Sequence, residues 1–359
     1  MLCACESSVG PTKDVEVDVK KSKPIWSEVQ EQIRIETLIP IVSDSVRMGS
    51  CQKACKIGEA VYILDPMQRA ILKYDLAAKS LMPFIHAVGS ARNEYTAIDD
   101  FCTDPKGNFC ILDGNKHRII RYDKEGKYID HFDCENATSM AALEDGSYAI
   151  NTCQTSSEDA LIRYSESGEQ LQKLPQTGKR LPIVLNNPGS ITSDEDGLLY
   201  TTPFDFNIYR VEDNERHSIA RLHFGEAAVD ANRLQGMDVI EAHQFITTNM
   251  DKISMLQNLY AYEDWIFFST DMNGQIMYNR SENTAVVLSN LELPYGILFA
   301  SPLFLNTDGE FCTILSENNV KQALIPLIEG TSTGIKAIDG ISTWKDTEAQ
   351  AWILTGRLH

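Results

Sequence analysis

The chain has 359 residues, of which 43% are hydrophobic, and its formal net charge at pH 7 is −19. That hydrophobic content is enough for a large folded core, and no run of 18 consecutive apolar residues offers a membrane-spanning helix. The acidic charge repels phosphate backbones, and no cluster of Lys and Arg with interleaved aromatic residues occurs, so the composition argues against nucleic-acid binding.

The first residues contain a motif for lipidation. Leu2-Cys3-Ala4-Cys5 has the form of a bacterial lipobox, in which an apolar residue and two small residues precede the Cys that is lipidated. The charged and apolar regions that normally precede a lipobox are missing, so the motif alone leaves lipidation of Cys5 and a chance match equally open. Residues 1–24 are otherwise polar and charge-rich, and we expect them to form a lipobox-like N-terminus and a flexible tether.

One sequence phrase recurs along the chain at a spacing of about 45 residues. Each copy has an apolar strand, a short polar turn and a second strand, which in the clearest copies ends in a basic residue and Tyr. This self-similarity is typical of a radial or solenoid array whose units share packed faces, so we expect residues 25–359 to form a single domain. Three clear copies and two degenerate copies occur, at residues 60–75, 109–123, 148–165, 198–212 and 265–280.

The first strand of each unit is apolar almost throughout, as in Val61–Leu64 and Trp265–Phe268. A continuous apolar run indicates burial on both faces, so each sheet must lie between two others. Pro, Gly and Asp punctuate the units and predict tight turns, whereas helical periodicity is nearly absent. We therefore expect units of four antiparallel strands at residues 49–84, 98–133, 138–174, 190–224 and 253–288, with a sixth unit that begins at Ser301.

The sixth unit lacks one strand. Residues 301–305, 310–315 and 351–354 supply three strands, and the unassigned segment 33–39 can supply the fourth. An open ring would leave two exposed sheet edges. We therefore predict an all-β, six-bladed β-propeller in which this N-terminal strand completes the last blade and closes the ring.

This arrangement leaves two long connections, at residues 225–252 and 316–350. Connections of that length in a compact domain are usually functional or disordered. The first joins two blades and the second joins the middle strands of the last blade, and in a propeller both types of connection emerge on the same face. We expect both to overhang the mouth of the central channel.

The nine cysteines show no zinc-binding spacing, and we interpret most of them as small core residues. Cys51 and Cys55 are too far apart on one strand to form a disulfide. Cys102 and Cys110 flank a turn at residues 104–107. They face each other if the loop between the two strands has five residues, and lie on opposite faces if it has four.

The chain resembles the six-bladed β-propeller lipoproteins of Bacteroides-type bacteria, a group related in form to NHL-repeat propellers. This resemblance implies the propeller fold, export and lipidation at Cys5, but it implies no reaction. Where the family typically has a Gly-Pro-Gly-Glu-Tyr-like segment, this chain has Ala91-Arg-Asn-Glu-Tyr95, which weakens any backbone-mediated ligand role of that loop. The resemblance covers residues 33–358 and rests on Ile33–Asp65, Val88–Tyr95, Ile98–Phe101 and Leu222–Gly225.

Polar residues gather where inner strands begin and where second strands end, and these positions meet at one mouth of the channel. A mixed set of carboxylates, amides and bases there suits a polar ligand, but Asp and Asn are also ordinary turn residues. For Asp99 and Asp100 the competing interpretation is that they accept backbone amide bonds and pair with Arg92. The candidate ligand-binding residues are Arg69, Arg92, Glu94, Tyr95, Asp99, Asp100, Asp113, Asn115, His117, Asn187, Asn249 and Asp271.

Since no motif of a hydrolase, NTPase or dehydrogenase occurs, the first hypothesis is a binding or scaffold module tethered to the bacterial envelope. It would bind a glycan, a peptide or a partner protein, would need no cofactor, and would touch the membrane only through its lipid anchor. The alternative is a lactonase-like hydrolase with a divalent cation such as calcium held by Asp99, Asp100, Asn187, Asn249 and Asp271. A third hypothesis is a structural component of a larger surface assembly.

Overall fold

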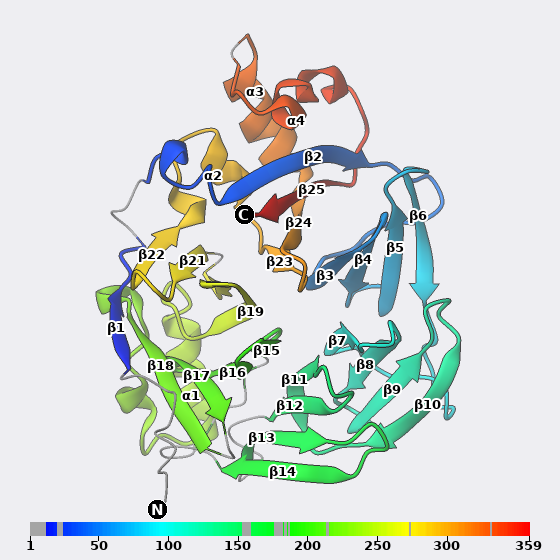
Figure 1. Ribbon diagram of the computed structural model, residues 1–359, viewed down its shortest axis with the longest axis vertical. Coiled ribbons are helices and arrows are strands. Elements are labelled where there is room, and N and C mark those ends of the chain that lie inside the picture. Colours follow the sequence, from blue (N-terminus) through cyan, green and yellow to red (C-terminus); the bar gives the residue numbers. More distant parts are fainter. Residues whose placement is uncertain are drawn as a thin grey trace, which may run out of the picture.

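The computed structural model shows six small antiparallel sheets arranged in a ring, a six-bladed β-propeller (Figure 1). The predicted fold class is therefore confirmed. The structure describes residues 12–19, 24–152, 159–175, 182, 185, 187–212, 215–272, 274–330 and 332–359, and the lipobox with Cys5 lies outside them. Among the described residues, no helix has the length and apolar character needed to cross a membrane.

Each blade has its inner strand at the channel and three further strands outside it. Blade one comprises β3 (Lys53–Ile57), β4 (Ala60–Asp65), β5 (Ala70–Asp75) and β6 (Ser80–Ile85). Blade two comprises β7 (Asp100–Thr103), β8 (Phe109–Asp113), β9 (Arg118–Tyr122) and β10 (Tyr128–Asp133). Blade three comprises β11 (Ala137–Ala142), β12 (Tyr148–Thr152), β13 (Asp159–Tyr164) and β14 (Gln170–Pro175). The second strands are buried from end to end in β4 and β8, as their continuous apolar runs predict.

Blades four and five follow the same plan. They comprise β15 (Ile191–Asp194), β16 (Gly197–Thr202), β17 (Asp205–Glu212) and β18 (Glu215–His223); and β19 (Leu256–Tyr262), β20 (Trp265–Thr270), β21 (Gln275–Asn279) and β22 (Thr284–Val287).

The N-terminal part of the chain completes the last blade. Blade six has the order β23 (Phe304–Leu305), β24 (Glu310–Ser316), β25 (Ala351–Leu358) and β2 (Ile33–Ile41) from the channel outwards. β2 and β25 are antiparallel, with Leu38 opposite Leu354. The prediction that an N-terminal strand closes the ring is confirmed, and the closure leaves no open edge between the first and last blades.

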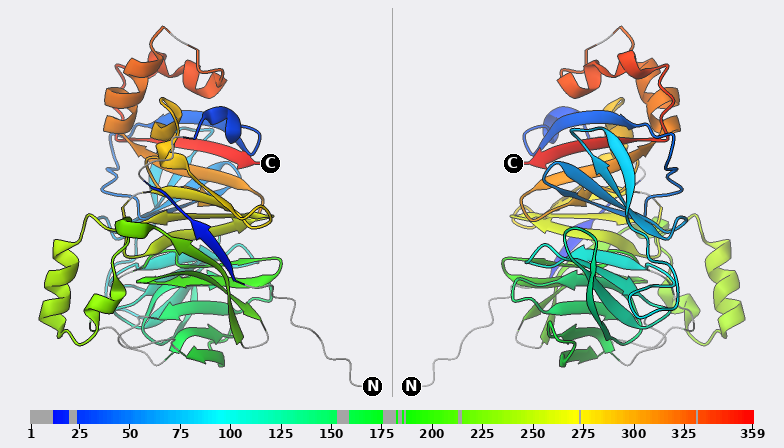
Figure 2. Two further views of the ribbon diagram at one scale, coloured as in Figure 1. Left: turned by 90° about the vertical axis from the view of Figure 1, so that its left-hand side faces the viewer. Right: turned by 90° about the vertical axis from the view of Figure 1, so that its right-hand side faces the viewer.

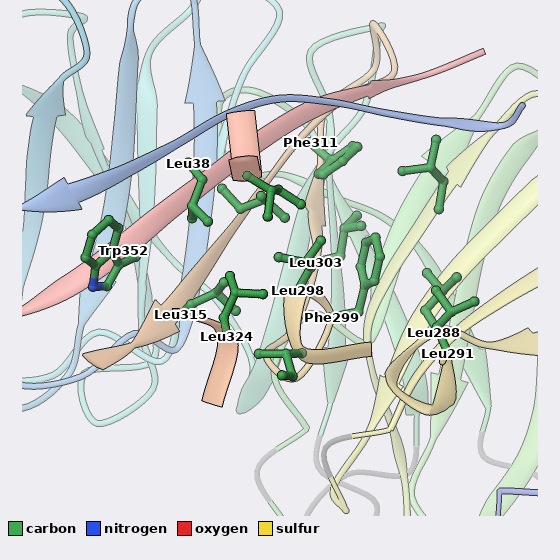
Figure 3. Packing of buried hydrophobic residues seen from close by; sticks show 14 of the residues in the cluster. Leu38, Leu288, Leu291, Leu298, Phe299, Leu303, Phe311, Leu315, Leu324 and Trp352 are labelled. Atoms are coloured by element: carbon green, nitrogen blue, oxygen red, sulfur yellow. The ribbon is translucent and has the colours of Figure 1, made fainter. Parts of the chain in front are cut away.

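A hydrophobic cluster lies beneath this closure (Figure 3). It joins Leu38 of β2 and Trp352 of β25 to Phe311 of β24 and to residues of the connections on either side, such as Phe299 and Leu324. Trp352 and Phe311 are fully buried, so the strand that closes the ring is held by apolar packing as well as by backbone hydrogen bonds.

The two long connections are helical and project from the same side of the ring (Figure 2), as predicted. One holds η2 (Gly225–Ala227), η3 (Ala231–Leu234) and α1 (Val239–Thr248). The other holds η5 (Asn318–Leu324), α3 (Ile325–Ile328), α4 (Lys336–Asp339) and η6 (Ile341–Trp344), and the shorter link between blades five and six holds η4 (Leu288–Asn290) and α2 (Tyr295–Leu298).

The expectation that both connections overhang the mouth of the channel is wrong, because Figure 1 draws α1 at blade four and not over the centre of the ring. Figure 1 places α3 and α4 beyond the outer strand β2, away from the centre of the ring. The reason is apolar burial, because Ile325, Ile328, Ile338 and Ile341 pack into the cluster of blade six. α1 instead packs with its own connection, where its buried Ala242 contacts a small cluster that includes Val229 and Leu234. A further short helical element, η1 (Trp26–Glu28), precedes β2.

The expected tether is not wholly free of structure. β1 (Lys13–Glu16) pairs in parallel with β18 and adds a fifth strand to blade four. Val15 is 2% exposed and Val17 is 3% exposed, because both pack into the cluster between blades four and five. The expectation of a flexible tether is therefore wrong for these residues, since the alternation in Asp14-Val-Glu-Val17 is that of a half-buried strand.

Candidate functional site

A cavity of about 520 Å³ lies on the axis of the ring, where all six inner strands contribute to its wall. It opens between the turns that join first and second strands, at Gly58, Gly107 and Thr307. Because successive strands of a blade run in opposite directions, these turns lie at the other end of the channel from the helical connections. The cavity therefore opens on the face opposite to the one for which the sequence predicted a site.

One side of the cavity is aromatic. Phe101, Tyr62 and Phe109 line it, with the rings of Tyr62 and Phe109 4.6 Å apart and those of Phe101 and Phe109 6.4 Å apart. Aliphatic side chains such as Ile191 and Leu305 extend this apolar side. The rest of the wall carries polar and charged side chains, and small-molecule sites likewise combine an apolar lining with polar groups.

Lys53 in the cavity wall forms an ion pair between blades one and two. Nζ of Lys53 lies 2.7 Å from Oδ1 of Asp100, and Asp100 is fully buried. The other carboxylate oxygen of Asp100 accepts hydrogen bonds of 2.9 Å from the hydroxyl of Ser139 and from the amide of Met140. The Lys53 ammonium also lies 5.6 Å from the centre of the Phe101 ring. Every bond of this carboxylate is thus made within the protein.

The same network continues into blades three and four. The amide of Ser190 donates to the hydroxyl of Ser139 at 3.1 Å, and Nδ2 of Asn151 donates to the hydroxyl of Ser190 at 2.9 Å. Ser139 and Ser190 are fully buried. A chain of hydrogen bonds therefore links blades one to four around the channel and fixes the spacing of their inner strands.

A second ion pair lies at the mouth of the cavity. Nζ of Lys56 lies 2.9 Å from the carboxylate of Glu310, which also accepts a hydrogen bond of 2.8 Å from Arg357. Partial burial by itself would raise the pKa of Glu310, but the hydrogen bond and charge of Lys56, helped by Asn306 and Arg357, lower the pKa on balance. This carboxylate is therefore ionised at neutral pH and joins blade six to blade one.

The hydroxyl of Tyr260 on β19 differs from these groups because it has no partner in the part of the chain that the structure describes. Tyr260 lines the cavity, and its hydroxyl oxygen is buried without a hydrogen bond to any described residue. Burial, reinforced by the negative charge of Asp100, raises the pKa of Tyr260 well above its usual range. The group is therefore a neutral hydroxyl enclosed in the cavity wall, with its hydrogen-bond donor unused among the described residues.

Two cysteines line the cavity, Cys55 and Cys102. Burial raises the pKa of Cys55 to about 11. A hydrogen bond with Cys110, followed by burial, raises the pKa of Cys102. Both are neutral thiols at physiological pH, so only a small fraction of either is present as the nucleophilic thiolate.

On the opposite face, three carboxylates at the ends of second strands share one structural role. Asp113 accepts a hydrogen bond of 2.7 Å from the amide of Thr96, and Asp271 accepts one of 3.0 Å from the amide of Ser254. In blade one, Asp65 likewise accepts one of 2.6 Å from the amide of Gly49. Each carboxylate ties the approach to an inner strand to the neighbouring second strand, as its turn chemistry predicts.

The other candidates in blades one and two lie in the same part of the rim. Tyr95 is fully buried, and its hydroxyl donates a 2.8 Å hydrogen bond to the carbonyl of Arg69. Glu94 accepts one of 2.8 Å from the amide of Ala91. The remaining side chains project into solvent, namely those of Arg69, Arg92, Asn115 and His117.

Asp99 faces the rim, whereas Asp100 faces the channel network. The carboxylate of Asp99 accepts a 2.7 Å hydrogen bond from the amide of Gly114, and burial raises the pKa of Asp99. The hydrogen bonds from backbone amides that the competing interpretation expects are thus present, but the cation beside Asp100 is Lys53 and not Arg92.

The candidates in blades four and five are not brought into one site. Asn249 ends α1, where its Nδ2 donates to the carbonyl of Phe245 at 2.8 Å. Asn187 is 1% exposed, and neither polar atom of its amide has a partner among the described residues. Over the same part of the chain, no three His, Cys, Asp or Glu side chains converge as a metal site would require.

Sequence reasoning missed Lys53, Cys55, Cys102 and Tyr260. Lys53 and Cys55 are two residues apart on β3, and the period of two along a strand is a signal that could have placed both on one face of the sheet. The convergence of Lys53 with Asp100 joins two blades and has no local signal in the sequence.

A family model for a domain of unknown function, DUF4934, matches residues 48–336. The chain belongs to this family. No curated protein matches the chain.

Solved structures show the same fold at low sequence identity. A Bacteroides fragilis protein for which export is proposed is 14% identical, with a TM-score of 0.68, and the match covers 96% of this chain and 99% of that one. A member of the duf4221 family from Bacteroides vulgatus is 10% identical, with a TM-score of 0.54 and coverage of 92% and 99%. A protein for which gluconolactonase activity is proposed matches with a TM-score of only 0.49, at 10% identity and coverage of 94% and 97%, and this likeness carries no argument about chemistry.

Proposed function

We propose that this DUF4934 protein is an exported, non-enzymatic binding module that holds a small, largely apolar ligand in its axial cavity. The observation that carries the proposal is the hydroxyl of Tyr260, which is buried at the cavity without a partner among the described residues. A buried donor without a partner is costly, and an acceptor group on a ligand would satisfy it. The aromatic wall of Tyr62, Phe101 and Phe109 would hold the apolar part.

The size of the cavity narrows the ligand class. A cavity of about 520 Å³ suits a small molecule or one end of a peptide or glycan, but not a folded partner protein. Binding at the opposite rim stays a prediction. The metal-dependent hydrolase gains no support, because the carboxylates assigned to it bond to backbone amides or to Lys53.

Attachment to the cell envelope through Cys5 belongs to the same proposal. The likeness to a Bacteroides fragilis protein for which export is proposed supports export. Since β1 runs parallel to β18, its first residue, Lys13, lies beside the turns of Glu195 and Asp264 at the cavity end of the propeller. The chain between Cys5 and Lys13 can span at most about 29 Å, so a lipid on Cys5 would keep the cavity mouth towards the membrane.

The apolar anion 8-anilinonaphthalene-1-sulfonate is a suitable probe, because it combines aromatic rings with an acceptor group. We expect saturable fluorescence enhancement with the folded protein, and at least a tenfold weaker affinity after Thr192→Trp, which fills the cavity from β15. Thr284→Trp, on the exposed side of β22, is the matched control and should bind as the parent does. Equal affinity of both variants, with circular dichroism confirming that both fold, would rule out the cavity as the site.

A further inference from the structure

The two cysteines of blade two lie directly opposite each other. Cys102 of β7 pairs with Cys110 of β8 in an antiparallel register. The loop between the strands consists of residues 104–108, and its ends are joined by a 2.9 Å bond from the amide of Asp104 to the carbonyl of Asn108. The five-residue alternative is thus the one that the structure adopts, and the two side chains share one face of the sheet.

The backbone geometry of such a pair suits a disulfide. Directly opposed residues of antiparallel strands have Cα atoms about 4.5–5.5 Å apart. Disulfides join Cα atoms about 4.4–6.8 Å apart, so the expected Cα separation lies within the range that a disulfide spans. Both residues pack in the cluster between blades two and three, where Cys110 also lies 3.4 Å from the hydroxyl of Tyr148.

The two thiols differ in their access to solvent. Cys102 lines the axial cavity, whereas Cys110 is fully buried behind it. A small molecule that enters the cavity therefore meets Cys102 first, and Cys110 is placed to react only with the sulfur of Cys102.

We propose that Cys102 and Cys110 form a thiol–disulfide site that is oxidised by small-molecule disulfides entering the axial cavity. In the first step, the thiolate of Cys102 attacks one sulfur of the disulfide, which forms a mixed disulfide and releases one thiolate. In the second step, the thiolate of Cys110 attacks the sulfur of Cys102 and releases the other thiolate. The protein loses two electrons and two protons, and the small disulfide is reduced to two thiols.

The environment of the pair sets the rate. The hydrogen bond between the two thiols, followed by burial, raises the pKa of Cys102, so the thiolate fraction at neutral pH is small. We therefore expect slow oxidation at neutral pH and faster oxidation as the pH rises. Cys55 is the competing partner for a disulfide with Cys102, because it also lines the cavity. The two residues are close enough that the charge of Cys102 raises the pKa of Cys55.

Reaction of the full chain with oxidised glutathione tests the proposal. The reduced protein is incubated at about pH 7 and about pH 9, denatured, alkylated with iodoacetamide and digested with trypsin. Because trypsin cleaves after Lys106, a Cys102–Cys110 disulfide links residues 93–106 to residues 107–116. We expect this linked peptide to accumulate, and to do so faster at the higher pH.

Variants separate the two steps. In the Cys110→Ala variant, glutathione should remain attached to Cys102. In the Cys102→Ala variant, Cys110 should remain a free thiol and should be fully alkylated by iodoacetamide. Cys134→Ala, at another half-buried cysteine, should form the linked peptide as the parent does. Thermal unfolding of each variant verifies that it folds. If both cysteines of the parent are completely alkylated after treatment with oxidised glutathione, the proposal is overturned. A disulfide from Cys102 to Cys55 instead of Cys110 would overturn it too.

Discussion

Nζ of Lys53 on β3 lies 2.7 Å from Oδ1 of Asp100 on β7, so one buried ion pair joins blades one and two at the wall of the axial cavity. The Asp100 carboxylate has no access to solvent and bonds in addition to Ser139 and Met140. A buried charge of this kind depends on its counter-ion, because the surrounding protein cannot replace water.

Replacement of Lys53 by Met should therefore be strongly destabilising. The change leaves the Asp100 carboxylate buried without a cation, and we expect a loss of about 3–5 kcal/mol in the free energy of unfolding. Urea denaturation followed by circular dichroism measures it. Lys124→Met, at an exposed lysine of the same cavity mouth, should change that free energy by no more than about 0.5 kcal/mol.

The double variant Lys53→Met with Asp100→Asn distinguishes the loss of charge balance from the loss of packing. Because no charge is then left buried, it should be more stable than the single Lys53→Met variant. A double variant as unstable as the single one would show that the lysine stabilises the blade mainly through its aliphatic chain.

Tyr260 and Tyr95 offer an opposite pair of tests. The hydroxyl of Tyr260 has no partner among the described residues, so Tyr260→Phe should leave the ligand-free protein equally stable or more stable by about 1–3 kcal/mol. The hydroxyl of Tyr95 donates to the carbonyl of Arg69, so Tyr95→Phe should be destabilising by about 0.5–1.5 kcal/mol. Denaturation midpoints of the two variants should move in different directions, and a marked loss of stability in Tyr260→Phe would argue for a bound partner in the free protein.

The ion pair at the cavity mouth predicts a pH dependence. Partial burial opposes the ionisation of Glu310, but Lys56, Asn306 and Arg357 together lower its pKa below the ordinary value of 4.5. A lowered pKa means that the ionised carboxylate stabilises the fold above its unfolded pKa, and that this contribution is lost as the pH falls through the folded pKa.

Glu310→Gln should therefore be less stable than the parent at neutral pH, and the two stabilities should converge between about pH 5 and about pH 3. Thermal unfolding across this range measures both curves. Glu144→Gln, which removes an exposed carboxylate on the same face, should give a curve parallel to that of the parent. A constant gap between Glu310→Gln and the parent down to low pH would contradict the assigned ion pair.

The architecture was predictable because it depends on local patterns. The apolar runs of the second strands, as in Val61–Leu64, and the turn residues between strands recur at a fixed spacing, so the number of blades and the closing strand follow from counting. Parts of the chain that break the repeat were harder to read. α1 has a capping box formed by Asp238 and Glu241, a local signal that a closer reading of residues 225–252 could have used.

The candidate site was less predictable, because its groups come from different blades. Asp113 and Asp271 were recognised as polar turn residues, but the sequence could not show that their carboxylates accept hydrogen bonds from the amides of Thr96 and Ser254. In the same way, the lack of a partner for the Tyr260 hydroxyl becomes visible only when all inner strands are in place. Strand pattern reveals which face of a sheet a residue lies on, but not which residue of another blade it meets.

The ring closure gives the last prediction. Leu38 of β2 is 4% exposed and lies opposite Leu354 of β25 over the cluster shown in Figure 3. Leu38→Ala removes buried methyl groups and leaves a cavity, so we expect a loss of about 2–5 kcal/mol in the free energy of unfolding, whereas Glu36→Ala, on the exposed side of the same strand, should change little. If β2 were dispensable for closure, the two variants would unfold at the same urea concentration. A loss confined to Leu38→Ala, together with faster hydrogen exchange in β25, would show that the N-terminal strand holds the propeller shut.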